Sequence, residues 1–121
     1  MHYEGEERFD VLPLLVATNG AIAAFGYEGR RLRPNRVIAG VEGLAERMWP
    51  GHILRINEIL IGVEDLRGRC VMTTFDPDTL QQDQDVLKSI VARFAGKLAL
   101  NCFVLRGGEM QVGDEVEILE N

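Results

Sequence analysis

The 121-residue sequence has few of the side chains on which most catalytic and metal sites are built. It contains two cysteines (Cys70 and Cys102), two histidines (His2 and His52) and a single serine, Ser89. This set does not supply the three or four closely spaced ligands of a zinc site, and it disfavours a serine triad or a Cys–His pair. With a polar, acidic N-terminus and no secretion signal, the two cysteines indicate free thiols in a reducing cytoplasm.

Three further features exclude other classes. No stretch approaches the ~18 consecutive apolar residues of a membrane span. No glycine-rich phosphate loop of the P-loop or dinucleotide type is present. The net charge of −6 argues against nucleic acid or an anionic membrane as the main partner. The length and the 46 % hydrophobic content fit one domain over residues 1–121, of which 1–8 are expected to form a flexible terminus.

Short apolar segments bounded by turn residues predict a mainly β fold. The expected strands are 11–17, 35–39, 53–56, 58–63 and 98–105, followed by a closing hairpin of 110–112 and 116–119. Ile59, Ile61 and Val63 alternate with Leu60 and Gly62, so both faces of that strand are apolar. Because regular helices do not separate the strands, we expect a small closed or partly open β-barrel with two or three peripheral helices.

Two helices are expected outside this sheet. Thr18 is a candidate N-cap for a helix over 19–25 that ends at Gly26. A second helix over 84–94 begins after Asp83, a candidate N-cap, and ends at Gly96. Its apolar stripe, expected to cover an open side of the sheet, consists of Val86, Leu87, Ile90, Val91 and Phe94.

The stretch 68–79, GRCVMTTFDPDT, carries the strongest candidate for chemistry, Cys70. A free thiol titrates near ~8.5 and is mainly protonated at pH 7. Arg67, Arg69 and the N–H groups of a tight loop would favour the thiolate, the form that ligates soft metals and attacks electrophiles. The alternative is that Cys70 is a small buried hydrophobe. Cys102 lies in mid-strand, where we expect a core residue with a raised pKa.

Arginines form a second cluster within seven residues: Arg30, Arg31, Arg33 and Arg36. In an acidic protein such a cluster suggests a small anionic ligand, although solvated surface is the simpler interpretation. Pro34 biases Arg33 towards an extended backbone, and Arg33 offers a planar fork for phosphate. Asn35 offers a paired donor and acceptor that suits the edge of a pterin. We predict that Arg33 and Asn35 share one concave site with Cys70.

Four segments together resemble the MOSC domain, the family named after the C-terminal domain of molybdenum cofactor sulfurase. They span most of the chain, from about residue 9 to 119, and the segment around Cys70 is the most specific. They are PLLV with Thr18, LRPN at 32–35, RCVMTTFDPDT at 69–79 and GEMQVGD at 108–114.

The resemblance implies a barrel-like β fold and a role in sulfur or molybdenum chemistry. In enzymes of the family, such as the mitochondrial amidoxime-reducing component, the matching cysteine ligates molybdenum and the matching Arg-Pro-Asn lies against the pyranopterin. By that similarity Cys70 is the catalytic residue, as metal ligand or persulfide carrier. The cofactor contacts would be Arg33, Asn35, Thr18, Arg69 and Thr73. At family level, pyridoxal phosphate binding is also implied.

Three functional interpretations stay open. The chain binds molybdenum cofactor or carries sulfur on Cys70; it is a molybdenum-dependent reductase of N-hydroxylated compounds; or it is a non-catalytic binding module that has lost the cofactor. The expected partners are a small anionic cofactor, a sulfur donor or electron-transfer protein, and a second copy in a homodimer, with a cytoplasmic location. Longer relatives carry an N-terminal β domain before the matching region, which this chain is expected to lack.

Overall fold

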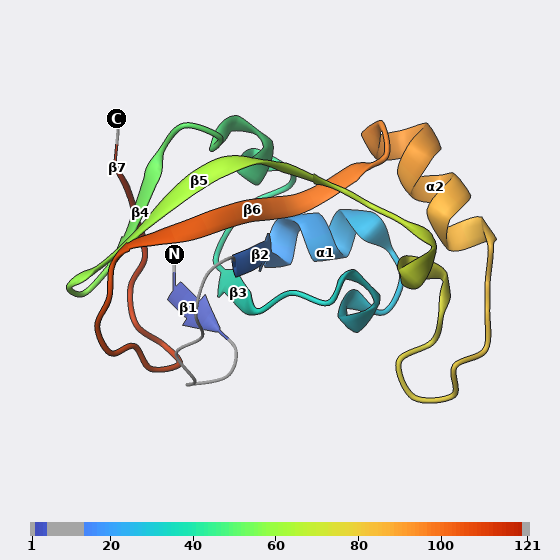
Figure 1. Cartoon of the computed structure of the whole chain (residues 1–121), viewed down its shortest axis with the longest axis horizontal. Helices are drawn as coiled ribbons and strands as arrows, with labels where there is room; N and C mark the ends of the chain where they lie inside the picture. Colours follow the sequence, from blue (N-terminus) through green and yellow to red (C-terminus); the bar gives the residue numbers. More distant parts are fainter. Residues whose placement is uncertain (1, 5–13, 120–121) are drawn as a thin grey trace.

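The computed structural model describes residues 2–4 and 14–119, arranged around one seven-stranded sheet. The strands lie in the order β1-β3-β2-β6-β5-β4-β7 (Figure 1). β2 and β3 are parallel, and all other neighbours are antiparallel. The strands are β1 (His2–Glu4), β2 (Leu14–Thr18), β3 (Arg36–Ala39), β4 (Ile53–Ile56), β5 (Ile59–Gly68), β6 (Lys97–Arg106) and β7 (Glu117–Leu119).

Two α-helices and three short 3-10 helices complete the described chain. They are α1 (Asn19–Phe25), α2 (Asp85–Phe94), η1 (Gly29–Leu32), η2 (Ala45–Met48) and η3 (Val71–Thr74). The sheet curls, and its edge strands β1 and β7 do not pair with each other within the described residues. This confirms the predicted mainly β fold as a small, partly open barrel with peripheral helices. None of the described helices is long and apolar enough to cross a membrane.

β5 and β6, each ten residues long, run side by side along the molecule (Figure 1). Their register shifts at Leu60/Ile61, Val63/Asp65 and Leu66/Gly68. Such irregularities bend a strand and increase its twist, which lets the long pair curve around the core.

The buried apolar side chains form two clusters rather than one. The larger fills the barrel and includes Leu14, Ile61 and Leu100. The smaller joins α1, η1 and α2 around Phe25, Leu32, Val86, Ile90 and Phe94. Burying an Ile or Phe side chain is worth about 1.5–3 kcal/mol, so each cluster contributes substantially to folding.

α1 follows the prediction closely. The Thr18 hydroxyl accepts a hydrogen bond from Ala21 N–H, and Gly26 ends the helix in the left-handed region at φ 79°. Gly20 allows the helix to approach the backbone of the loop after β3, because an added Cβ would lie 2.1 Å from Gly43 O. α1 can therefore sit this close only with glycine at position 20.

α2 begins one residue later than predicted, and its apolar stripe is narrower. Gln84 occupies the N-cap position, while the Asp83 carboxylate still accepts a hydrogen bond from Asp85 N–H. Leu87 is half-buried and Val91 is 57 % exposed, so the expectation that both belong to the packed face was wrong. The helix lies at one end of the sheet rather than along it, and one of its sides has no neighbouring element within the described residues (Figure 1).

The predicted C-terminal hairpin is also wrong. Residues 110–112 form no strand, and Glu117–Leu119 pairs with β4 instead. The Asp114 carboxylate accepts hydrogen bonds from Gln111 N–H and the Asn57 amide, which closes a local turn and leaves 110–112 unpaired. At the N-terminus, where a flexible segment was expected, His2–Glu4 pairs with β3, and 5–8 lie outside the described residues.

Candidate functional site

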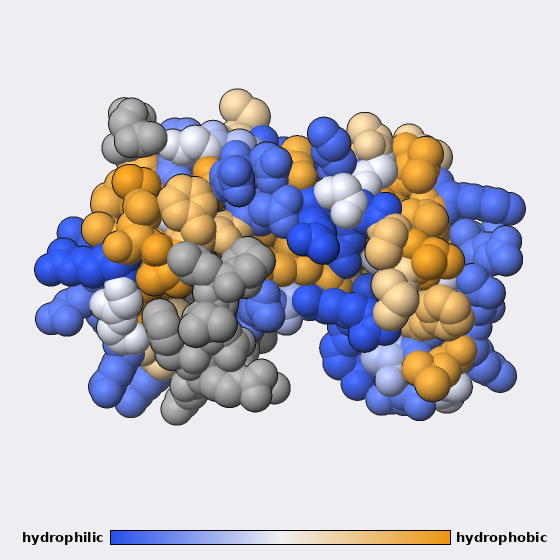
Figure 2. Space-filling model, in the orientation of Figure 1, coloured by the Kyte–Doolittle hydropathy of each residue, from blue (hydrophilic) through white to orange (hydrophobic). Residues whose placement is uncertain are grey.

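A cavity of about 310 Å³ lies between the segment from η1 to β3 and the segment from β5 to η3. In Figure 2 the face turned to the viewer is hollowed in its middle, and strongly hydrophilic residues border the hollow. The lining comes from β2, β5, β6 and the two segments. It consists of Leu14, Leu15, Leu32, Arg33, Asn35, Arg67, Gly68, Arg69, Cys70, Met72 and Asn101. The prediction that Arg33, Asn35 and Cys70 share one concave site is confirmed.

Cys70 is held where β5 ends and η3 begins. Arg69 N–H donates to Gly96 O at 2.8 Å, which fixes the strand end against the loop after α2. The Thr73 hydroxyl and N–H both donate to Cys70 O, at 2.9 and 3.1 Å. The Cys70 side chain is exposed, so the backbone around the thiol is fixed while the sulfur stays accessible. Thr73 itself is buried and does not line the cavity.

Arg69 places a desolvated positive charge in the cavity wall. Its Nη2 donates to Leu32 O, whereas its buried Nε and Nη1 have no hydrogen-bond partner among the described residues. Burial, followed by the charge of Arg67, lowers the pKa of Arg69 to about 10, so the side chain is still cationic at neutral pH. Buried N–H groups without a partner carry a desolvation cost, which an anionic ligand accepting from them would offset.

Arg33 and Asn35 reach the cavity in a way the sequence did not predict. Arg33 adopts the left-handed region (φ 54°, ψ 48°) rather than the extended backbone expected before Pro34, because it closes η1 through a hydrogen bond from its N–H to Arg30 O. Asn35 Oδ1 accepts from Leu15 N–H at 2.7 Å, and Asn35 N–H donates to Leu15 O at 2.7 Å. One acceptor position of the Asn35 amide is thus used on β2, and no described residue accepts a hydrogen bond from its Nδ2, which can donate to a ligand.

Two other arginines of the cluster hold the walls together instead of facing the cavity. Arg30 forms a two-pronged pair with the Asp78 carboxylate, at 2.7 and 3.1 Å. Arg31 Nη1 donates to Thr74 O at 2.8 Å. These contacts clamp η1 onto the loop after Cys70 and explain why the acidic Asp-Pro-Asp-Thr turn follows the thiol.

Thr18 lies outside the cavity lining. Its hydroxyl caps α1 and donates to Oε1 of the buried Glu46 at 2.8 Å. Its proposed contact with a cofactor therefore stays a prediction, while its structural role is clear.

Asn101 and Asp65 were missed by reasoning from the sequence. Asn101 lines the cavity from β6, where Leu100 and Cys102 on either side made the segment look like simple core. A polar residue inside an apolar strand was the available signal, since buried strands are otherwise nearly continuous in apolar character.

The second thiol, Cys102, is buried. Cys102 is 2 % exposed, and burial raises its pKa to about 12, as predicted. Both cysteines are free thiols in the structure. The described residues contain no group of three or more His, Cys, Asp or Glu side chains suited to a metal ion.

The cavity combines one accessible thiol with three guanidinium groups, those of Arg33, Arg67 and Arg69. Among the described lining residues none is a carboxylate, although the chain carries a net charge of −6. This concentration of positive charge suits a ligand that is anionic and that also offers a soft or electrophilic centre to sulfur.

Comparison with known proteins agrees with this geometry. The family model of the MOSC domain matches residues 18–117. The YUAD protein from Bacillus subtilis has a similar crystal structure, with a TM-score of 0.66 and 18 % identity over 97 % of this chain and 69 % of that chain. At this identity the likeness shows a shared fold. No curated protein matches the chain. Because the family model spans most of the chain, including the segments that carry Arg33, Asn35 and Cys70, the chain belongs to the MOSC domain family.

Proposed function

We propose that this MOSC domain binds the molybdenum cofactor in the arginine-lined cavity, with the Cys70 thiolate as the protein ligand of molybdenum. One observation supports this most directly. An accessible thiol shares the cavity with Arg69, whose buried Nε and Nη1 groups have no hydrogen-bond partner in the part of the chain that the structure describes. Thiolate sulfur is a preferred ligand for soft metals, and guanidinium groups pair readily with phosphate.

The cavity residues would divide the work in the following way. Arg69 and Arg33 would receive anionic oxygen atoms of the cofactor, and the Asn35 Nδ2 group would donate to a heterocycle edge. Leu14, Leu15 and Leu32 supply apolar wall. When bound, the cofactor would supply redox chemistry at the metal, and this chain would supply the sulfur ligand and the compensating charge. The volume of about 310 Å³ is at the small end of ligand pockets.

The test is the metal content of protein purified from a host that makes the cofactor. We expect wild-type protein to carry molybdenum and pterin, measured by elemental mass spectrometry and by fluorescence of the oxidised pterin. Cys70→Ala should lose the metal. Cys102→Ala, which removes the buried thiol outside the cavity, is the matched control and should keep it. Molybdenum retained by Cys70→Ala, or absent from the wild type, would contradict the proposal.

Sulfur carriage on the same thiol is a second candidate, favoured by the exposure of Cys70. A donor persulfide would transfer its terminal sulfur to the Cys70 thiolate and leave as a thiol, so Cys70 would carry the persulfide with no net oxidation. Intact mass of freshly purified wild-type protein would then show one extra sulfur atom that reductant removes, without molybdenum, and Cys70→Ala would not show it. The same preparations therefore separate the two functions.

A further inference from the structure

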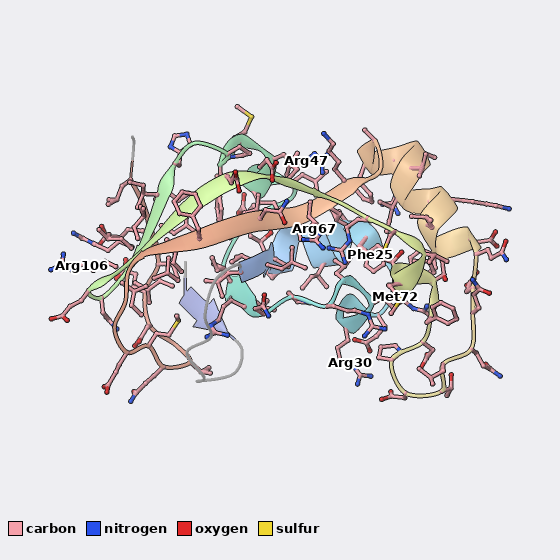
Figure 3. All side chains as sticks on the ribbon, viewed as in Figure 1. Phe25, Arg30, Arg47, Arg67, Met72 and Arg106 are labelled. Atoms are coloured by element: carbon pink, nitrogen blue, oxygen red, sulfur yellow. The ribbon has the colours of Figure 1, made fainter. Side chains whose placement is uncertain are left out.

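A chain of three polar side chains borders the cavity on the side of β5 and β6. Arg67 Nη1 donates to Asn101 Oδ1 at 3.2 Å, and Asn101 Nδ2 donates to Asp65 Oδ1 at 2.7 Å. Arg67 and Asn101 line the cavity, whereas Asp65 does not. Figure 3 shows Arg67 in the middle of the molecule and Arg106 at one end.

The chemistry of these groups fixes how the Asn101 amide is turned. An ionised carboxylate only accepts hydrogen bonds, and a guanidinium only donates them. Asn101 must therefore present its Nδ2 to Asp65 and its Oδ1 to Arg67. Asp65 thus sets the direction of the amide, and the amide sets the position of the guanidinium.

The backbone places the three residues by an irregularity in the sheet. The register shift between Val63 and Asp65 brings Asp65 opposite Asn101. Arg67 lies two residues beyond Asp65 on β5, so their side chains can flank Asn101 on one face. Bulges commonly re-aim a side chain next to a functional site.

Arg67 has capacity left for a ligand. Within the described residues it uses one N–H in this chain, and a guanidinium carries five. Its positive charge acts on Arg69, and that of Arg33 does so too, so three guanidinium groups lie close together, and no described residue that lines the cavity is a carboxylate. Like charges in one cavity repel, and an anion between them relieves that repulsion.

We propose that Arg67, held in place by Asn101 and Asp65, forms an oxyanion subsite of the cavity for a phosphate- or sulfate-type group. Arg67 is the binding residue, and Asn101 and Asp65 are positioning residues. The proposal rests on the proposed function only in taking this cavity as the ligand site. The oxyanion is either the phosphate of the cofactor or an anionic group of a separate substrate, and both share the same chemistry.

The probes are inorganic phosphate and sulfate, titrated by calorimetry at low ionic strength into protein made in a host that lacks the cofactor. Wild-type protein should bind both anions. Arg67→Gln should weaken binding about tenfold, the effect of one lost charge-assisted hydrogen bond. Arg106→Gln is the matched control, because it removes the same charge from an exposed arginine outside the cavity lining, and it should change binding less than twofold.

Substitutions at Asp65 separate positioning from simple electrostatics. If Asp65 acted only through its charge, both Asp65→Ala and Asp65→Asn would tighten anion binding, because each removes a negative charge near the cavity. If it positions Asn101, Asp65→Ala should weaken binding severalfold. Asp65→Asn keeps an oxygen that accepts from Asn101 Nδ2, so it should restore binding to at least the wild-type level. Asn101→Ala should weaken binding as Asp65→Ala does, with circular dichroism and thermal melts confirming that each variant is folded.

The outcomes distinguish this subsite from the proposed function. Oxyanion binding with the expected Arg67 and Asp65 effects, but no molybdenum, supports the subsite and removes the metal role of Cys70. The subsite alone is overturned if Cys70 carries molybdenum but the protein binds no oxyanion. It is also overturned if Arg67→Gln leaves oxyanion binding unchanged or if Asp65→Ala tightens it. Cofactor-loaded protein that no longer binds phosphate identifies the cofactor as the source of the oxyanion, and retained binding identifies a separate anionic substrate.

Discussion

The two thiols of the chain lie in opposite environments, and their reactivity should differ accordingly. Cys70 is exposed at the cavity, whereas Cys102 is 2 % exposed with its pKa raised to about 12. At pH 7 a thiol with that pKa is ionised in only about one molecule in 10⁵, and the thiolate is the nucleophile. Brief iodoacetamide treatment followed by peptide mapping should label Cys70 at least tenfold faster. Equal labelling would leave Cys70 no more reactive than a core residue.

Glu46 is the one acidic side chain among the buried residues of the described chain, and it makes stability depend on pH. Burial raises its pKa, while hydrogen bonds from Thr18 partly oppose the shift. The folded chain therefore holds this proton more tightly than the unfolded chain does. The stability that the group contributes is fully present below the unfolded pKa, about 4.3, and is lost as pH rises through the folded pKa.

Glu46→Gln, which mimics the protonated side chain, should remove this dependence. The free energy of unfolding of the variant should gain on that of the wild type as pH rises above about 4.3, by at most about 1.4 kcal/mol per pH unit. Urea unfolding of both proteins between pH 4 and 8 measures the difference between their free energies of unfolding. The effects of the other carboxylates are common to both proteins and cancel in this difference. A difference that does not change with pH would show that the buried carboxyl titrates normally.

At the scale of elements, the clamp between η1 and η3 decides whether the two cavity walls keep their spacing. Arg31, whose side chain is 11 % exposed, donates from Nη1 to Thr74 O. Arg31→Met should cost about 1.5–3 kcal/mol, the usual value for hydrogen bonds of a charged group, and should speed amide exchange in 70–79.

Arg55→Met is the control for this clamp. Arg55 pairs with Glu117 across two strands, and both side chains are about half exposed. Surface pairs of this kind contribute about 0–1 kcal/mol, so the control should lose little stability and leave exchange in 70–79 unchanged. If both variants lost equal stability, Arg31 would be no more than a surface charge.

The elements also show which parts of the structure could be predicted from local sequence. Thr18 and Gly26 bound α1 as predicted because caps act within one turn. Arg33 departs from the expected backbone because closing η1 outweighs the local bias from Pro34. β7 differs from the predicted hairpin strand because it pairs with the free edge of β4 instead. Such pairing between distant strands cannot be predicted from the residues of one segment. Asn101 could not be assigned, since its partner Asp65 is 36 residues away.

For the whole molecule, the class of fold and the shared cavity of Arg33, Asn35 and Cys70 could be predicted from the sequence, and the structure confirms both. It could not separate arginines that face the cavity from those that fasten its walls. That separation depends on which acceptors the fold brings near, such as the Asp78 carboxylate for Arg30. The sequence shows that the segment is rich in arginine, but the partner of each arginine depends on the tertiary structure.

The cavity lies between the two apolar clusters, and this position has a consequence for the lifetime of the protein. Leu14 belongs to the barrel cluster and Leu32 to the helical cluster, and both line the cavity. A ligand in the cavity would contact both clusters, so its binding would raise the free energy of unfolding. The increase is about 2.7 kcal/mol at a ligand concentration a hundred times the dissociation constant. Proteases act on the unfolded fraction, and occupied molecules would outlast empty ones. The supply of ligand would then set how much of the protein a cell keeps.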